Sequence, residues 1–347
     1  MKIDVLIVGQ GLAGSFLAWE CLEKGISVVV VDDKHQTSAS ALAAGMINPI
    51  TGQRLTLENR FREFQRKARA SLSSIERFLG RPLYFERAIV RYFQGRKERE
   101  LWERRRLEDR YRGYLPMSDS SHYFRILGGA YCDCKTLLEG VGRRLSEEGC
   151  LIREAFDHGA LQFMQGTAHK VAWKKYRARW VIFCEGYRWD KNPWWNWIPS
   201  RPARGEIVTL RSISGKQTQN IHQMSGKWLL PLADGLFKAG STYDWDEVER
   251  GPTPEGRLEI VSALAPLLER YDLDGVDQVA GVRPVSLDRQ PLLGFHREEG
   301  SIGIFNGFGA KGVLRIPHYA ALFVNFLRGK QSLPREADTC RFANRGY

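Results

Sequence analysis

Two short apolar runs near the N-terminus flank a helix-like segment. Residues 3–8 are apolar apart from Asp4, and residues 26–31 form a second apolar run. Both runs are typical of buried parallel strands. Residues 15–24 between them repeat apolar positions such as Phe16 and Trp19 at helical spacing. The pattern therefore predicts a strand–helix–strand unit, from which parallel α/β sheets are built.

Two later stretches have a different pattern, in which apolar and polar positions alternate at short intervals. Such alternation, in residues 83–124 and 207–278, is typical of antiparallel strands with one buried face. We expect a second, substrate domain there on a mixed or antiparallel sheet, with a helix over residues 258–268. We expect a polar, loose tail after Pro334. The remaining chain is expected to form one discontinuous Rossmann-like domain of residues 1–82, 125–206 and 279–347.

The turn after the first strand has the glycine spacing of a dinucleotide-binding site. Gly9 permits a tight turn, Gly11 lets the backbone approach a pyrophosphate, and Gly14 allows close helix packing. Asp32, 23 residues after Gly9, is placed to accept hydrogen bonds from ribose hydroxyls and disfavours a 2′-phosphate. The spacing does not separate NAD from FAD. The same turns supply three more candidate binding residues, Leu12, Ala13 and Asp33.

A segment of small residues follows the second strand. Residues 37–49 would let backbone N–H groups approach a ligand, and their hydroxyls can donate to phosphate. An alanine-rich helix is the alternative interpretation. The candidate binding residues in this segment are Ser38, Ser40, Ala44, Gly45 and Met46.

Five segments resemble, in the right order, motifs of the D-amino acid oxidase, glycine oxidase and sarcosine oxidase family of FAD enzymes. They include the motifs A-A-G-M, P-x-R-G and G-x-R-P, and they span nearly the whole chain. The resembling segments are residues 37–49, 180–186, 202–206, 281–294 and 306–313. The resemblance implies that the Rossmann-like domain binds FAD. Further cofactor-binding residues that it implies are Gly186, Arg283, Gly307, Gly309, Ala310, Lys311, Gly312 and Val313.

Two departures from the family pattern bear on how FAD is held. The family's ribose acid is more often Glu than the Asp found here. Family members that hold flavin covalently place a Cys shortly after the R-P pair, where this chain has Val285, Ser286 and Leu287. We therefore expect non-covalent FAD.

The resemblance also implies the reaction. Enzymes of this kind oxidise the C–N bond of a small amino acid or N-substituted glycine by hydride transfer to flavin N5, which gives an imine that water hydrolyses. Oxygen or another electron acceptor then reoxidises the flavin. An alternative is the same oxidation of a carboxymethylaminomethyl group on a tRNA uridine. A third reading is a non-catalytic flavoprotein subunit of a hetero-oligomer.

Three residues are candidates for catalysis. Arg283 can hold a substrate carboxylate with two parallel hydrogen bonds, and a salt bridge to Asp288 or another core acid is the alternative. By resemblance, Lys238 lies above the flavin, where a cation favours electron transfer to oxygen. Met46 either lines the substrate side of the ring or only packs there. The resemblance implies that Lys311 passes the N1–C2=O edge of the flavin, where a cation stabilises the anionic reduced flavin. The backbone N–H groups of residues 309–312 are an alternative source of that stabilisation.

Charge brings nucleic acid into consideration. Lys and Arg number 52 against 40 acids, a net charge of +12. However, residues 95–112 mix Arg with Glu, which predicts a salt-bridged helix with pairs Glu100–Arg104 and Glu108–Arg112. No RNA-binding module is recognisable, so nucleic acid is an alternative partner and not the expected one. Four tryptophans lie close together in the sequence: Trp189, Trp194, Trp195 and Trp197. We expect them either to fill a domain junction or to form an exposed contact patch for another subunit.

The N-terminus and the cysteines indicate the compartment. The chain starts Met1-Lys2-Ile3-Asp4, without a secretory h-region, and no apolar stretch approaches the ~20 residues of a spanning helix. The six cysteines are scattered, and Cys132 and Cys134 lack partners at zinc-like spacing. We expect a reduced cytoplasmic protein without a metal. The oligomeric state is left open.

Overall fold

The two N-terminal apolar runs form neighbouring parallel strands of an eight-stranded sheet. The computed structural model describes residues 1–33, 38–117 and 120–342, so Thr37 of the small-residue segment lies outside the described residues. In this sheet the order is β10-β2-β1-β13-β12-β11, and β20 pairs with both β13 and β19. Its strands are β1 Lys2–Val8, β2 Val28–Val31, β10 Leu151–Ile152, β11 Gln162–Phe163, β12 Val171–Trp173, β13 Tyr176–Phe183, β19 Leu292–Phe295 and β20 Ile302–Asn306.

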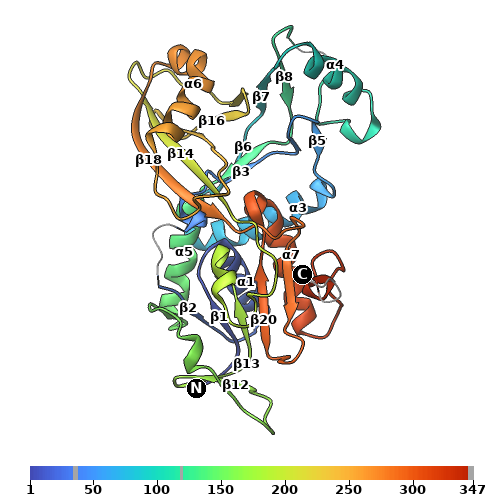
Figure 1. The fold of residues 1–347 in the computed structure, drawn as a ribbon, viewed down its shortest axis with the longest axis vertical. Coiled ribbons are helices and arrows are strands. Elements are labelled where there is room, and N and C mark those ends of the chain that lie inside the picture. Colours follow the sequence, from blue (N-terminus) through green and yellow to red (C-terminus); the bar gives the residue numbers. More distant parts are fainter. Residues whose placement is uncertain (34–37, 118–119, 343–347) are drawn as a thin grey trace.

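Helices cover one face of this sheet, as Figure 1 shows for the lower part of the molecule. They pack with the apolar side of β1 and β2 in the main hydrophobic core, to which Phe16, Leu17 and Phe323 belong. The covering helices are α1 Leu12–Glu23, α5 Cys134–Glu147 and α7 Gly312–Leu327, and α3 Phe61–Leu79 packs against α7. The predicted strand–helix–strand unit is therefore confirmed, with the helix starting three residues earlier than expected.

A second sheet of seven strands forms the upper part of Figure 1, in the order β18-β14-β17-β16-β15-β7-β8. It is antiparallel except where β15 runs parallel to β7, as expected for a mixed sheet. Its strands are β7 Ile89–Tyr92, β8 Tyr123–Ile126, β14 Ala203–Ser212, β15 Ile221–Met224, β16 Lys227–Pro231, β17 Leu236–Gly240 and β18 Leu273–Arg283. The predicted domain boundaries stay predictions, and three of them fall inside β8, β14 and β18.

Helix α6, Pro254–Tyr271, covers the second sheet and contains the predicted helix. The Thr253 side chain accepts a hydrogen bond from the Gly256 N–H, and Pro254 occupies the first turn. Ile260 and Leu264 face the sheet in a separate apolar core. Smaller elements complete the fold: α2 Ala39–Leu42, β3 Met46–Ile47, β4 Ile50–Thr51, β5 Thr56–Leu57, β6 Tyr84–Glu86, α4 Arg96–Arg105, β9 Ala130–Cys132, and the 3₁₀ helices η1 Asp109–Tyr111, η2 His158–Ala160, η3 Gly186–Lys191, η4 Gly309–Lys311 and η5 Thr339–Phe342.

The prediction for the tryptophan cluster is wrong. Trp189 and Trp195 are fully buried against the face of the first sheet that the helices leave open, in a core with Phe183. Only Trp197 has a large exposed fraction, 38%. The four tryptophans therefore complete the core of one domain, where side chains of their volume are needed.

The expected loose tail is also wrong, as far as residue 342. The η5 helix packs Phe342 into the core, and the Ala337 carbonyl accepts a hydrogen bond from the Leu293 N–H. Arg341 forms an ion pair with Asp288, in which Nε and Oδ2 lie 2.7 Å apart. Residues 343–347 of the predicted tail lie outside the described residues.

The salt-bridged helix is present, but its pairs differ from those expected. Glu100 pairs with Arg96 on α4, and Glu108 pairs with Arg105 and Arg110. Because the helix ends at Arg105, the register assumed for Glu108 does not continue. Arg96, Arg105 and Arg110 are thus paired with acids, whereas Arg99 and Arg106 donate to backbone carbonyls.

In the described ranges, no helix has the length and apolar character needed to cross a membrane. No group of three His, Cys, Asp or Glu side chains in those ranges could hold a metal ion. All six cysteines are free thiols.

His222 is buried in the second sheet without a charged hydrogen-bond partner. Its Nε2 lies 3.0 Å from the Tyr271 hydroxyl and 3.2 Å from that of Thr218. Burial, with a contribution from Arg270, lowers the pKa of His222 from 6.5 to about 4. The folded state therefore takes up this proton at a lower pH than the unfolded state does.

We predict that His222 destabilises the fold as pH falls from 6.5 towards 4, because only the unfolded state binds the proton in that window. In His222→Gln the loss of unfolding free energy between pH 7 and pH 4.5 should be smaller by about 2 kcal/mol. Urea titrations at both pH values measure it. His122→Gln, at an exposed histidine, is the control, and equal pH dependence in both variants would contradict the prediction.

Candidate active site

One large cavity lies between the two sheets. Its volume is about 1250 Å³, more than the ~300–1,000 Å³ of an ordinary small-molecule pocket. The carboxyl ends of β1, β2, β13 and β20 form one side, where open α/β sheets bind their ligands. Strands β14, β17 and β18 of the second sheet form the other side.

The glycine-rich turn has the geometry predicted for it. Gly9 has φ +99°, and a Cβ there would lie 2.6 Å from the Cys184 carbonyl oxygen. A Cβ on Gly14 would lie 1.8 Å from the Gly9 carbonyl oxygen, so the helix can pack this closely only with glycine. Because α1 starts at Leu12, the N–H groups of its first turn lie at the cavity. Gly9, Gly11, Leu12 and Ala13 line the cavity, whereas Gly14 shapes it from behind.

Asp32 and Asp33 both line the cavity at the end of β2. One oxygen of Asp32 accepts a hydrogen bond from the Gln10 N–H at 2.8 Å, which ties the second strand to the glycine turn. The other oxygen accepts one from Arg153 at 2.8 Å. Arg153 also lines the cavity. Sequence reasoning missed it because it follows β10, far along the chain from the glycine-rich turn.

The small-residue segment folds back over the glycine turn. Its helix, α2, is only four residues long, so the alternative of an alanine-rich helix applies to that piece alone. The Ser40 hydroxyl accepts a hydrogen bond from the Leu12 N–H at 3.0 Å. A Cβ on Gly45 would lie 2.0 Å from the Cys132 carbonyl oxygen. All of the predicted residues of this segment line the cavity: Ser38, Ser40, Ala44, Gly45 and Met46.

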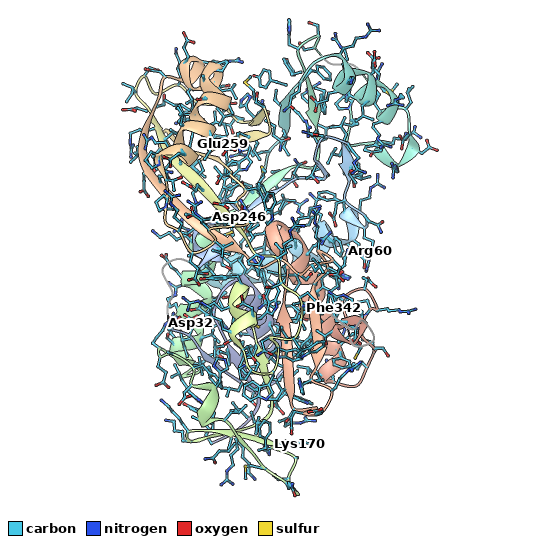
Figure 2. All side chains as sticks on the ribbon, viewed as in Figure 1. Asp32, Arg60, Lys170, Asp246, Glu259 and Phe342 are labelled. Carbon is cyan, nitrogen blue, oxygen red and sulfur yellow. The ribbon has the colours of Figure 1, made fainter. Side chains whose placement is uncertain are left out.

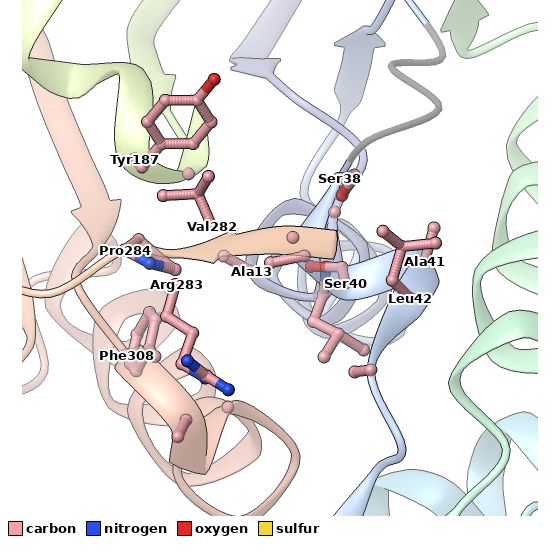
Figure 3. A pocket seen from close by; sticks show the side chains of 18 of the residues that line it. Ala13, Ser38, Ser40, Ala41, Leu42, Tyr187, Val282, Arg283, Pro284 and Phe308 are labelled. Atoms are coloured by element: carbon pink, nitrogen blue, oxygen red, sulfur yellow. The ribbon is translucent and has the colours of Figure 1, made fainter. Parts of the chain in front are cut away.

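Arg283 lies at the end of β18 and reaches into the cavity, as Figure 3 shows. It donates hydrogen bonds to the Ser241 hydroxyl at 2.7 Å and to the Arg204 carbonyl at 3.2 Å. The guanidinium also lies 4.1 Å from the centre of the Tyr243 ring. The alternative, a salt bridge to Asp288, is wrong, because Asp288 pairs with Arg341.

No carboxylate of the described chain pairs with Arg283. Its neighbours are neutral, and burial lowers the pKa of its guanidinium, with Tyr243 opposing that shift. The group lies across Gly205 of the adjacent strand, where a Cβ would be 2.1 Å from Nη2. The glycine thus makes room for a cation whose charge is left uncompensated.

Lys238 is a second partly buried cation that lines the cavity. It extends from β17, and its ammonium donates to the Ala43 carbonyl at 3.4 Å. Burial lowers its pKa, and Cys134 and Asp133 oppose that shift. Met46, which is half-buried in β3, lines the same cavity.

Lys311 lines the cavity, but its charge is already paired. Its ammonium and the Arg315 guanidinium both bind the carboxylate of Glu58, which is 5% exposed. Gly186, Gly309, Ala310, Gly312 and Val313 line the cavity as expected. Gly307 does not line it; with φ +76° it turns the chain against Leu292.

An ion-pair network behind Arg283 fixes the segment that follows β17. Arg204 pairs with Glu206 and with Asp244, and its Nε donates to the Arg250 carbonyl. The carboxylate of Glu206, which is 1% exposed, also accepts hydrogen bonds from Thr253. These contacts hold Ser241 to Tyr243 against Arg283.

Sequence reasoning missed several lining residues of the second sheet. Ser241 comes directly after the Lys238-Ala-Gly stretch, so its nearness to a motif was an available signal. Tyr243 was considered from the sequence as a pocket residue but left unassigned, and it does line the cavity. Trp228, Thr209 and Asp277 carry no motif, and only the pairing of strands brings them to the cavity. His222 and His318, which sequence reasoning left unassigned, are not among the residues that line the cavity.

A family model described as FAD dependent oxidoreductase matches residues 4–325. The chain belongs to this family. Like its relatives, it is an FAD-dependent oxidoreductase. The expected fold, a Rossmann-like FAD-binding domain with a second sheet domain, is confirmed.

Two solved structures and one curated protein illustrate the likeness. Glycine oxidase from Bacillus cereus ATCC 14579 has a TM-score of 0.76 and 22% identity, covering 95% of this chain and 96% of its own. Iminodiacetate oxidase from Chelativorans sp. BNC1 has a TM-score of 0.78 and 21% identity, covering 96% and 98%. At this identity they show the shared fold.

The curated protein is the tRNA 5-methylaminomethyl-2-thiouridine biosynthesis bifunctional protein MnmC of Leptospira borgpetersenii serovar Hardjo-bovis (strain JB197). It is 24% identical over 326 residues, which cover 83% of this chain. The chain spans 47% of the length of that relative.

The residues of the cavity fit FAD. Gly9 and Gly14 allow the tight turn and the close packing of α1, because a Cβ at either position would collide with a backbone carbonyl, and the first turn of α1 offers N–H groups to a pyrophosphate. The cavity continues from Asp32 to Arg283. Of the cysteines in the described ranges, only Cys184 lines it, and burial raises the pKa of that thiol. Non-covalent attachment stays a prediction.

We predict that Gly14→Ala abolishes retention of FAD, because its Cβ would push α1 away from the Gly9 carbonyl and misplace the first helical turn. The flavin-to-protein ratio after desalting should fall at least about tenfold, with far-UV circular dichroism reporting on the fold. Gly300→Ala, where a Cβ meets no atom within 4 Å, is the control. A folded Gly14→Ala protein with full flavin content would contradict this account.

Proposed function

We propose that the protein oxidises the C–N bond of a small amino acid or an N-substituted glycine, and that Arg283 holds the substrate carboxylate. The observation that carries this proposal is a cation at the cavity that has neutral partners only. Removing charge from water is unfavourable unless an opposite charge compensates. A carboxylate that enters with the substrate supplies that charge.

The shape of the Arg283 site favours a carboxylate over other anions. A guanidinium presents N–H groups in a plane, and a carboxylate accepts two of them in parallel. Arg283 is fixed by the Ser241 hydroxyl and by the Tyr243 ring, so its direction is set before the substrate arrives. One end of the substrate is thereby held, and its α-carbon and amine extend further into the cavity.

The remaining residues act around that anchor. FAD supplies the oxidising power for the C–N bond when it is bound. The N–H groups of Ala310 and Gly312 would stabilise negative charge, since those of Gly309 and Lys311 already donate to the Pro284 and Phe308 carbonyls and the Lys311 ammonium is paired with Glu58. Met46 and Trp228 contribute apolar surface that keeps water from the substrate.

Lys238 is proposed to provide the positive charge that assists electron transfer to oxygen. No acid forms an ion pair with its ammonium in the described ranges. A fixed cation in a site with little water stabilises a developing anion without reorganisation. Its lowered pKa implies that this charge is lost at a lower pH than for a free lysine.

A second candidate is the same oxidation on a carboxymethylaminomethyl group of a tRNA uridine. That group is itself an N-substituted glycine, so the Arg283 site would serve it unchanged. The similarity to the tRNA biosynthesis protein over 83% of this chain supports it, as does the net charge of +12.

We predict that an N-substituted glycine or amino acid bleaches the flavin absorbance under anaerobic conditions. The panel contains glycine, sarcosine, other amino acids and tRNA bearing the carboxymethylaminomethyl group, the last at several salt concentrations.

In Arg283→Gln, kcat/KM for the active substrate should fall about 100-fold or more, and Arg335→Gln, at an exposed arginine, should match the wild type. Full activity of Arg283→Gln would overturn the carboxylate site.

We further predict that Lys238→Met slows the reaction of reduced enzyme with oxygen by roughly a hundredfold. Stopped-flow mixing of the reduced protein with oxygenated buffer measures this rate. Lys216→Met, at an exposed lysine, serves as the matched control. Reoxidation as fast as in the wild type would show that Lys238 has another role.

A further inference from the structure

A row of neighbouring cationic and aromatic side chains leads from Arg283 to the surface. The Arg283 guanidinium lies 4.1 Å from the centre of the Tyr243 ring, and the Tyr243 and Trp245 rings are 5.9 Å apart with planes at 31°. The Arg201 guanidinium lies 5.8 Å from the Trp245 ring. Two aromatic rings thus connect a cation at the cavity with a cation outside it.

The two rings are exposed although they are large and apolar. Tyr243 is 52% exposed and Trp245 is 49% exposed. Neither belongs to any of the three hydrophobic cores. Stabilisation of the fold therefore does not account for their position, and exposed aromatic groups beside a pocket are typical of a binding site.

The segment that carries the rings is held in place. The Arg204 N–H and the Asp244 carbonyl form a backbone hydrogen bond of 2.8 Å, and Asp244 also pairs with the Arg204 guanidinium. Asp244 Oδ1 accepts the Asp246 N–H at 2.9 Å. Figure 2 labels Asp246, which lies between the upper sheet and the lower domain. The rings are therefore presented rigidly, which lowers the entropy lost when a ligand binds.

We propose that Tyr243 and Trp245 bind a planar ring carried by the amine substituent of the substrate. This proposal rests on the proposed function, in which the carboxylate is held by Arg283. Tyr243 lines the cavity and Trp245 stands next to it, so a substituent leaving the cavity past Tyr243 meets the Trp245 ring. Planar rings stack on such side chains, and the Arg201 cation adds attraction for their π electrons.

The shared chemistry is an N-substituted glycine with an aromatic or heteroaromatic ring close to its nitrogen. A benzene-type ring and a nucleobase both meet this description. Unsubstituted glycine would not reach the Tyr243 and Trp245 rings. A change at Trp245 should therefore affect the binding of ring-bearing substrates and leave the binding of glycine unchanged.

The test measures binding of unreactive carboxylates to the FAD-loaded protein by calorimetry. Phenoxyacetate and uridine-5-oxyacetate each carry a ring, and methoxyacetate has the same acid group without one. We expect both ring acids to bind about tenfold more tightly than methoxyacetate. Trp245→Ala should remove that advantage and leave methoxyacetate affinity unchanged. Trp245→Phe should restore most of it.

Phe163→Ala removes a 44% exposed aromatic side chain on β11 and is the matched control. Tighter binding of the uridine acid than of phenoxyacetate would assign the ring site to a nucleobase, and equal binding would assign it to aromatic rings in general. Equal affinity for ring and ringless acids in the wild type, or the same loss for both in Trp245→Ala, would overturn the proposal. Trp245-dependent binding of phenoxyacetate without any binding of methoxyacetate would support the ring site while contradicting the Arg283 site.

Discussion

The site depends on one constraint, a guanidinium that must lie flat across a neighbouring strand without an acid to neutralise it. Gly205 provides the space for Arg283, because any side chain there would occupy the position of the guanidinium. Neutral groups such as the Ser241 hydroxyl fix its direction. The charge is left for a ligand to compensate, which makes the cavity selective for anions.

The surrounding structure maintains this arrangement through charges that are paired. Arg204 and Glu206, both almost fully buried, neutralise each other and hold the segment that contacts Arg283. Lys311 and Arg315 likewise share the carboxylate of Glu58. Ion pairs therefore hold the scaffold in place, whereas Arg283 has no acid partner at the site where the reaction is proposed.

Local spacing made the nucleotide-binding half of the site predictable. Gly9, Gly14 and Asp32 act through neighbours in one turn and one strand, so their pattern carries their geometry. The partners of charged side chains were not predictable in this way. Glu58 meets Lys311, and Asp288 meets Arg341, across separations that only the folded chain closes. The buried tryptophans and the docked tail were misjudged for the same reason, because burial against a sheet depends on distant strands.

The most direct test of the central claim compares an acid with its uncharged amide. Methoxyacetate and methoxyacetamide have nearly the same shape, and titrating each into the FAD-loaded protein while recording the flavin absorption spectrum reports on binding in the cavity. The account predicts a saturable spectral change with methoxyacetate, weak or absent change with the amide, and loss of the acid's effect in Arg283→Gln. Equal binding of acid and amide, or unchanged binding of the acid to Arg283→Gln, would contradict it.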